Sequence, residues 1–223
     1  MQFSDKHLVS IPHIISEPRF ATYLRHCEND RRAALSLYQW NLEISSAFIV
    51  PLHLLEVSIR NAVVEALEDV HTSNWPWTQG FIISLPNPNS GYSPRQHLQG
   101  IAQRQPTMGK VVAELNLVFW ERMFTRRHDS RIWSGRVNPL FENAPAEYSA
   151  KQIRAAIHDD LRQIRGLRNR IAHHEPIFSR ELSADYETIY RLMLWRSAIT
   201  SEWMNDIQTV TKLISERPVD YGS

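Results

Sequence analysis

The sequence predicts an all-α protein. Apolar residues recur at the spacing of helix turns along most of the chain, and Leu52, Leu55, Ile59, Val63 and Leu67 form one clear example. The 223 residues include 7 glycines, and no two alternating β-branched runs are joined by an Asn-Gly or Asp-Gly turn. Such runs and turns are the usual signals of strands and hairpins. The pattern therefore favours helices throughout and offers no place for a sheet.

Caps and prolines predict the helices of the first half. One helix covers about residues 17 to 28, and a second begins after the N-cap Asp30 and runs to about residue 48. A third starts at Pro51, because proline suits the first turn of a helix, and continues to about residue 70. The segment 72–92 is rich in Pro, Asn and Ser. We expect a loop there, held to the protein by its two tryptophans.

The middle of the chain predicts shorter elements. Ser93, followed by a proline, begins a short helix. Thr107 is the expected N-cap of another helix, which carries apolar residues as far as Phe124. The segment 126–146 shows no steady period and is expected to be irregular.

A long helix and two shorter ones complete the predicted fold. The long helix is capped by Ser149 and ends near His174, because Pro176 cannot continue it. One further helix is expected after Ser183 and another over about residues 200 to 215. A chain of this length fits one domain, so we expect residues 1–223 to form a single all-α domain.

Composition limits the classes of function. The chain has 25 Lys and Arg against 24 Asp and Glu, so its net charge gives no argument for nucleic acid. One cysteine, Cys27, excludes an internal disulfide framework and a cysteine-built zinc site. The most apolar run, from Ala47 to Leu55, is interrupted by Pro51 and His53 and is short for a membrane span. We therefore expect a cytoplasmic protein with no membrane partner.

Positive charge is concentrated near the end of the long predicted helix. The run RQIRGLRNRIAHH, residues 162–174, contains four arginines and two histidines and no acid. Such a cluster suits a phosphate group. An arginine-rich run is more often a solvated helix face, and charge pattern alone does not decide between the two.

Helical phase separates the members of this cluster. At about 100° per residue, Arg168 falls on the apolar arc of its helix, while Asn169 and His173 lie at the border of that arc. A guanidinium so placed needs a carboxylate, an anionic ligand or a route to water. On the helix expected over residues 51–70, Glu56 also falls on the apolar arc. We hypothesise that Glu56 contacts Arg168, with Arg60 and Asn61 nearby; the alternative is a buried ion pair that only fixes helix register.

Three blocks of the sequence resemble a known family. RNRIAH, residues 168–173, matches the R-x4-H form of the R-x4-6-H motif of the HEPN superfamily. YQWNLEISSAFIVPLHLLEVSIRNAVVEAL (38–67), TMGKVVAELNLVFWERMF (107–124) and RNRIAHHEPIF (168–178) are similar, in this order, to blocks of the Abi-like (abortive infection) proteins. The resemblance covers about residues 20 to 200.

The resemblance implies a HEPN-type antiparallel helical bundle with additional helices. It also implies a role in phage defence or a toxin-type system, a homodimer with its site at or near the interface, and a possible antitoxin-like partner protein. Active members of the superfamily are metal-independent endoribonucleases, which implies RNA as the substrate and no cofactor or metal. The alternative is a non-catalytic HEPN module that binds RNA, a nucleotide or a partner protein.

The implied chemistry assigns roles to the clustered residues. Arg168 and His173 are the catalytic candidates and Asn169 orients them or binds the phosphate. A histidine, with a reference pKa near ~6.5, suits proton transfer at neutral pH, and an arginine offers a planar fork of donors to a phosphate. A second proton-transfer group would come from His174 or from the partner subunit's His173. The supporting residues and RNA-contact candidates are Glu56, Arg60, Asn61, His174, Arg162, Arg165 and Arg170.

Overall fold

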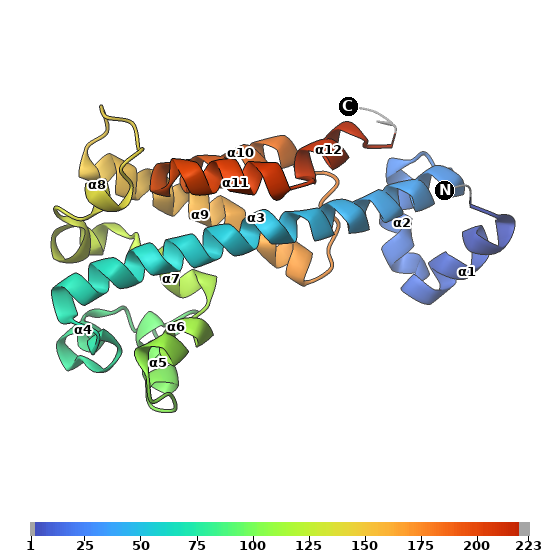
Figure 1. Cartoon of the computed structure of the whole chain (residues 1–223). Coiled ribbons are helices and arrows are strands. Elements are labelled where there is room, and N and C mark those ends of the chain that lie inside the picture. Colours follow the sequence, from blue (N-terminus) through green and yellow to red (C-terminus); the bar gives the residue numbers. More distant parts are fainter. Residues whose placement is uncertain (1–2, 219–223) are drawn as a thin grey trace.

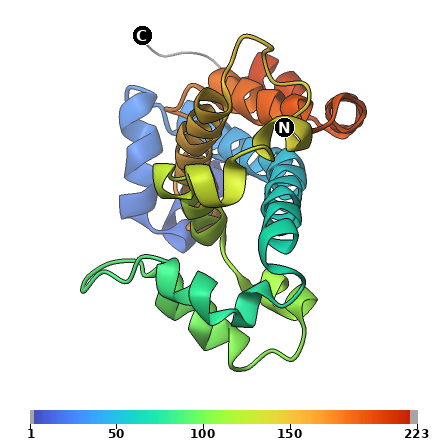
Figure 2. The same ribbon diagram turned by 90° about the vertical axis from the view of Figure 1, so that its left-hand side faces the viewer.

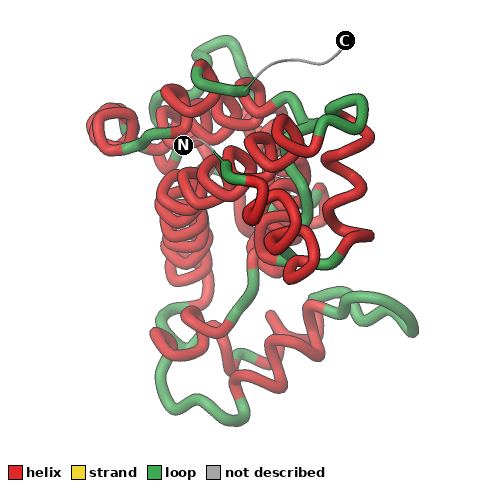
Figure 3. Tube along the Cα trace, turned by 90° about the vertical axis from the view of Figure 1, so that its right-hand side faces the viewer, coloured by secondary structure: helices red, strands yellow, loops and turns green. Residues whose placement is uncertain are grey.

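The computed structural model describes residues 3–218, and all regular structure in that range is helical (Figure 3). The predicted all-α class is confirmed. The α-helices are, in chain order, α1 (Asp5–Ile15), α2 (Glu17–His26), α3 (Arg31–His71), α4 (Gln79–Ser84), α5 (Pro94–Ala102), α6 (Met108–Glu114), α7 (Leu117–Met123), α8 (Val137–Leu140), α9 (Ala150–Ala172), α10 (Leu182–Arg196), α11 (Ala198–Ile207) and α12 (Val210–Ser215). Three short turns join them: the 3-10 turns η1 (Trp75–Trp77) and η2 (Arg126–His128), and the π-helical turn η3 (Asp129–Trp133).

Helix α3 is the long axis of the molecule (Figure 1). It has 41 residues, which corresponds to roughly 60 Å at about 1.5 Å per residue. Asp30 caps its first turn by accepting hydrogen bonds from the backbone N–H groups of Arg32 and Ala33, as predicted. Helices α2, α7, α10 and α12 pack along it. Burial of apolar side chains over this whole length therefore stabilises α3 far more than intrinsic helix propensity can.

The predicted break before Pro51 is wrong, because α3 passes through this residue without interruption. A proline inside a helix loses one backbone hydrogen bond and clashes with the preceding turn, at a cost of about 3 kcal/mol. The apolar residues on both sides continue in helical phase, and the proline ring itself is buried. Packing on both halves of α3 outweighs the local cost.

Helix α9 runs antiparallel to α3, and α7 and α10 each pack against both helices (Figures 1 and 2). Helices α1 and α2 lie at the N-terminal end of α3, whereas α4, α5 and α6 form a separate layer beyond its C-terminal half. The buried apolar side chains form one cluster that extends from Phe3 to Val210. This core holds the C-terminal end of α9 beside the middle of α3.

Several predicted helices are divided or shifted in the structure. The helix expected over residues 107–124 is two helices, because Leu115 is extended and Asn116 accepts the N–H of Phe119 as the cap of α7. The helix expected over 200–215 is likewise divided into α11 and α12. The expected cap Ser183 lies inside α10, whose N-cap residue is Glu181.

Short elements occupy segments that were expected to be loops. Segment 72–92 contains η1 and α4, and segment 126–146 contains η2, η3 and α8. Helix α1 was not predicted at all. The predicted caps Ser93, Thr107 and Ser149 are confirmed, since each side chain accepts a backbone N–H of its own first turn.

In the described range, α3 is the one helix that is long and apolar enough to cross a membrane by length and composition. The expectation that Pro51 and His53 would interrupt any such segment does not hold for the continuous helix. A core helix of a soluble protein meets the same criterion. The packing of α2, α10 and α12 against α3 is compatible with a soluble protein.

The buried residue His128 makes the stability of the fold pH-dependent. It is 1% exposed, and burial, followed by the neighbouring Arg127 and Arg131, lowers the pKa of His128 to about 4. Below pH ~6.5 His128 is protonated in the unfolded chain but stays neutral in the folded chain. The free energy of unfolding therefore falls as the pH drops toward 4. We expect His128 to contribute up to about 3 kcal/mol to this loss in the free energy of unfolding. His128→Phe should remove it, as measured by urea unfolding between pH 4 and 7.

The matched control for this measurement is the exposed residue His13. His13→Phe should keep the wild-type pH dependence of the free energy of unfolding. Equal pH slopes in wild type and His128→Phe would show that His128 does not carry the effect.

Candidate functional site

A pocket of about 520 Å³ lies between the middle of α3 and the C-terminal end of α9. Its wall from α3 combines apolar and polar side chains, and its wall from α9 ends in a histidine. The lining residues are Leu42, Ser45, Ser46, Ile49, Leu52, His53, Glu56, Arg168, Ile171, Ala172 and His174. Both helices were expected to contribute to a site, and this pocket is where the structure brings them together.

Arg168 lines the pocket and is exposed to solvent. The expectation that its side chain lies in the protein core is therefore wrong. Its direction is as predicted, because Leu161, Ile164 and Leu167 of the same arc are buried and Ile171 lines the pocket with it. At the last turns of α9 this side of the helix lines the pocket and is not covered by another helix. The guanidinium therefore has the route to water that its charge requires.

The expected contact between Glu56 and Arg168 is not formed. Both residues line the pocket, yet no ion pair within 4.0 Å joins them in residues 3–218. Glu56 is half-buried, as is Arg60, whose Nε is buried without a hydrogen-bond partner. Asn61 is exposed and does not line the pocket. Of the three supporting residues expected on α3, Glu56 alone belongs to this site.

The two histidines after α9 are placed differently. The helix ends at Ala172, and His173 is its C-cap residue, exposed and outside the pocket. His174 takes a left-handed conformation with φ of 56°, which turns the chain back so that His174 lines the pocket with Arg168. A non-glycine residue in this region costs on the order of 1 kcal/mol or more. The surrounding protein must therefore hold the turn.

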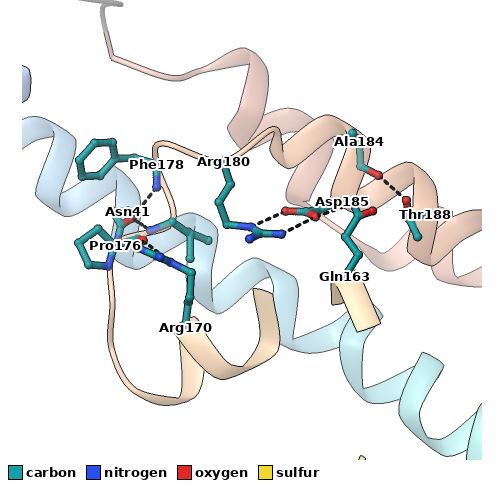
Figure 4. Close-up of polar contacts among 10 residues, drawn as sticks. Asn41, Gln163, Arg170, Pro176, Phe178, Arg180, Ala184, Asp185 and Thr188 are labelled. Carbon is teal, nitrogen blue, oxygen red and sulfur yellow. Dashed lines mark hydrogen bonds and ion pairs between the residues drawn. The ribbon is translucent and has the colours of Figure 1, made fainter. Parts of the chain in front are cut away.

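Three side chains hold the turn through hydrogen bonds. Arg19 of α2 donates a hydrogen bond of 2.7 Å to the backbone oxygen of His174. Buried Asn41 of α3 accepts the N–H groups of Ile177 and Phe178 at its Oδ1 atom, at 2.8 and 3.2 Å (Figure 4). Arg170 donates two hydrogen bonds to the carbonyl of Pro176. The segment that carries His174 is thus attached to α2, α3 and α9.

A buried carboxylate fixes the next part of the same segment. Asp185 of α10 is 1% exposed and receives two hydrogen bonds of 2.8 Å from Arg180 and one of 3.1 Å from Gln163 (Figure 4). Paired charges with satisfied hydrogen bonds fix geometry, although their net stabilisation is small. Together with Asn41, this cluster gives the turn after α9 a single defined path.

The remaining arginines of the cluster have separate roles. Arg165 pairs with the buried carboxylate of Glu121, and Arg170 is engaged by Pro176 and by Glu175 at 3.7 Å. Both were candidates for RNA contact, and both are used within the fold. Arg162 is exposed on α9, away from the pocket. Asn169 is half-buried and likewise does not line the pocket.

The sequence alone did not identify three polar residues of the pocket, Ser45, Ser46 and His53, and it gave His174 only a supporting role. His53 is exposed on α3 and lines the pocket with Arg168 and His174. The signal was present, since His53 lies three residues before Glu56, which places both on one side of a helix.

A second pocket of about 410 Å³ adjoins the first and shares Leu42, Ser45, Ile171 and His174 with it. It also contains Arg19 and Tyr23 of α2. Burial, followed by the neighbouring Tyr38, raises the pKa of Tyr23, so its hydroxyl stays neutral at physiological pH. His174 lines both pockets, with Arg168 in the first and Arg19 in the second.

Replacing Asn41 by leucine should destabilise the turn. The change leaves two buried N–H groups, those of Ile177 and Phe178, without an acceptor. At about 1–3 kcal/mol for each of the two buried groups, we expect a loss of about 2–6 kcal/mol in the free energy of unfolding, measured by urea titration. Asn61→Leu makes the same change at an exposed site of α3 and should cost less than about 0.5 kcal/mol. Similar losses in both variants would contradict this role of Asn41.

Comparison with protein-family models, with curated proteins and with solved structures finds no match for this chain. The Abi-like resemblance and the HEPN-type bundle therefore stay predictions, beyond the all-α architecture. In residues 3–218, no group of three or more His, Cys, Asp or Glu side chains is placed so that it could hold a metal ion. The site is defined by its own geometry: one arginine and two histidines around an accessible pocket.

Proposed function

We propose that this protein is a metal-independent endoribonuclease that uses the 2′-OH of RNA as its nucleophile. The observation that carries the proposal is the sharing of one pocket by Arg168 and His174, next to His53 and Glu56. A cation and an imidazole that can accept or donate a proton are the minimum for this chemistry. No ion pair engages Arg168 within residues 3–218, which leaves its guanidinium available to a phosphate.

The reaction forms a bond from the 2′-oxygen to phosphorus and breaks the bond from phosphorus to the 5′-oxygen. The proton of the 2′-OH passes to a base, and a proton is delivered to the departing 5′-oxygen. The products are a 2′,3′-cyclic phosphate and a free 5′-OH. Negative charge on the non-bridging oxygens increases in the transition state, and the planar donors of Arg168 would stabilise it.

In this proposal His174, which lies in the pocket, takes the proton-transfer role first given to His173. The change keeps the motif, because Arg168 and His174 are separated by five residues and fit the R-x5-H form of the same pattern. His173 and Asn169 do not line the pocket and would act on parts of the RNA outside it.

The exposed apolar surface beside the pocket supports the proposed homodimer. Leu42 and Ile49 line the pocket and are 53% and 52% exposed, and Val50 nearby is 40% exposed. Exposed apolar residues that are grouped beside polar ones often mark an interaction surface. We propose that this part of α3 contacts a second copy of the chain.

We also propose a cytoplasmic defence or toxin-type role for the protein, with an antitoxin-like protein as its partner.

The test is cleavage of total RNA and of tRNA by the purified protein, with and without EDTA. The proposal expects cleavage that resists EDTA, yields 2′,3′-cyclic phosphate ends, and is lost when His173 and His174 are both replaced by asparagine. Substrate containing 2′-deoxy sugars should not be cut. Absence of cleavage, or equal cleavage by the double variant, would overturn the proposal; retained RNA binding without cleavage would instead support the non-catalytic module.

A further inference from the structure

The pocket contains a second histidine that comes from a different helix. His53 belongs to α3, whereas Arg168 and His174 belong to α9 and the turn after it. The side chain of His53 is exposed and makes no hydrogen bond or ion pair within the part of the chain that the structure describes. It is therefore free to meet a ligand, and nothing in the packing of the fold requires it to be a histidine.

Cleavage through the 2′-OH needs two proton transfers at different positions. The attacking 2′-oxygen and the departing 5′-oxygen lie on opposite sides of the phosphorus, so one fixed side chain cannot reach both. General acid and general base catalysis therefore call for two groups within hydrogen-bond reach of the two oxygens. Helix α3 and the turn after α9 supply one histidine each to the lining of a single pocket, which Arg168 also lines.

We propose that His53 and His174 act as the pair of proton-transfer groups, one as the base and the other as the acid. This inference rests on the proposed function and adds a catalytic residue from α3. A single chain then contains both groups, and the reaction does not depend on the partner subunit's His173. The other charged or titratable residues that line the pocket are Arg168, His174 and Glu56, the last of which lies on the same helix as His53.

The pocket lining also contains the carboxylate of Glu56, which is a competing acid-base group. Its place on α3, three residues after His53, suits it to orient the imidazole or to repel a wrongly placed phosphate. Replacement of Glu56 by glutamine keeps its shape and should therefore change the rate much less than loss of His53.

The decisive experiment compares pH–rate profiles of wild type, His53→Ala and His13→Ala in EDTA. His13 is an exposed histidine on α1 and serves as the matched control. Wild type and His13→Ala should share a bell-shaped profile of kcat/KM against pH. His53→Ala should lose activity by a factor of about 10²–10⁴ and should lose one limb of the bell.

Two further measurements separate catalysis from binding and assign the roles. The affinity for an uncleavable 2′-O-methyl RNA should be the same in wild type and His53→Ala, because His53 acts on protons. A nucleoside 3′-(4-nitrophenyl phosphate) has a leaving group that needs no acid. If His53 is the acid, His53→Ala should cleave this substrate at nearly the wild-type rate; if it is the base, the loss should persist.

A bell-shaped profile and near wild-type rate in His53→Ala would overturn the inference while the proposed function stands. Lack of cleavage by the wild type would instead overturn the proposed function and remove the basis of this one. The wild-type reaction, run in the same series, therefore distinguishes the two failures.

Discussion

Replacing His174 by asparagine is expected to lower the rate of RNA cleavage by a factor of about 10²–10⁴, the usual value of a proton-transfer group. His174 lines the pocket with Arg168, and its φ of 56° lies in the left-handed region. Asparagine tolerates this conformation better than alanine does, so the substitution removes the imidazole with little change in the turn. The measurement is kcat/KM on a defined RNA, with circular dichroism to confirm folding.

The neighbouring histidine provides the comparison. His173 is exposed and does not line the pocket, so His173→Asn should reduce the rate by less than about tenfold, which is below the usual contribution of a proton-transfer group. A large loss in His173→Asn together with a small one in His174→Asn would return the catalytic role to His173. That result would mean that the active arrangement differs from the turn described above.

Replacing Arg168 by alanine is expected to reduce kcat by a factor of about 10²–10³, the usual effect of removing one donor to a charged transition state. Arg168 is exposed in the pocket and has no internal ion pair in the described part of the chain. Its removal should therefore cost little stability. Arg168→Lys keeps the charge but loses the planar fork of donors, and it should recover only a small part of the lost rate.

Arg162→Ala is the matched control for Arg168. It removes the same charge from an exposed position of α9 outside the pocket. If Arg168 acted only by non-specific electrostatic attraction of RNA, both variants would raise KM by the same factor. The difference in KM between each variant and the wild type would then vanish at high salt. Equal losses in the two variants would thus argue against a specific role for Arg168 at the scissile phosphate.

Helical phase correctly predicted which side of α9 carries Arg168, but the predicted burial of its side chain was wrong. Period and arc depend on the local sequence, so the side of α9 that carries Ile164 and Arg168 could be identified from the sequence. Whether another helix covers that side at a given turn depends on tertiary packing. The last turns of α9 extend beyond close contact with α3, and a pocket fills the space.

The position of His174 could not be predicted for a different reason. A regular helix would separate Arg168 and His173 by about 140°. The left-handed turn at His174 depends on Arg19 and Asn41, which are far away in the sequence. Such long-range contacts leave no local signal. The caps Asp30 and Ser149, in contrast, act within one turn of their own helices, and both could be recognised.

Proline at position 51 divides the α3 wall of the pocket into two halves. Leu42, Ser45 and Ile49 precede it, and His53 and Glu56 follow it. A helix bends most easily where a proline removes a backbone hydrogen bond. A change in the bend of α3 at this proline would therefore shift His53 and Glu56 relative to Ser45 and Ile49, and it would alter the shape of the pocket wall that these residues form.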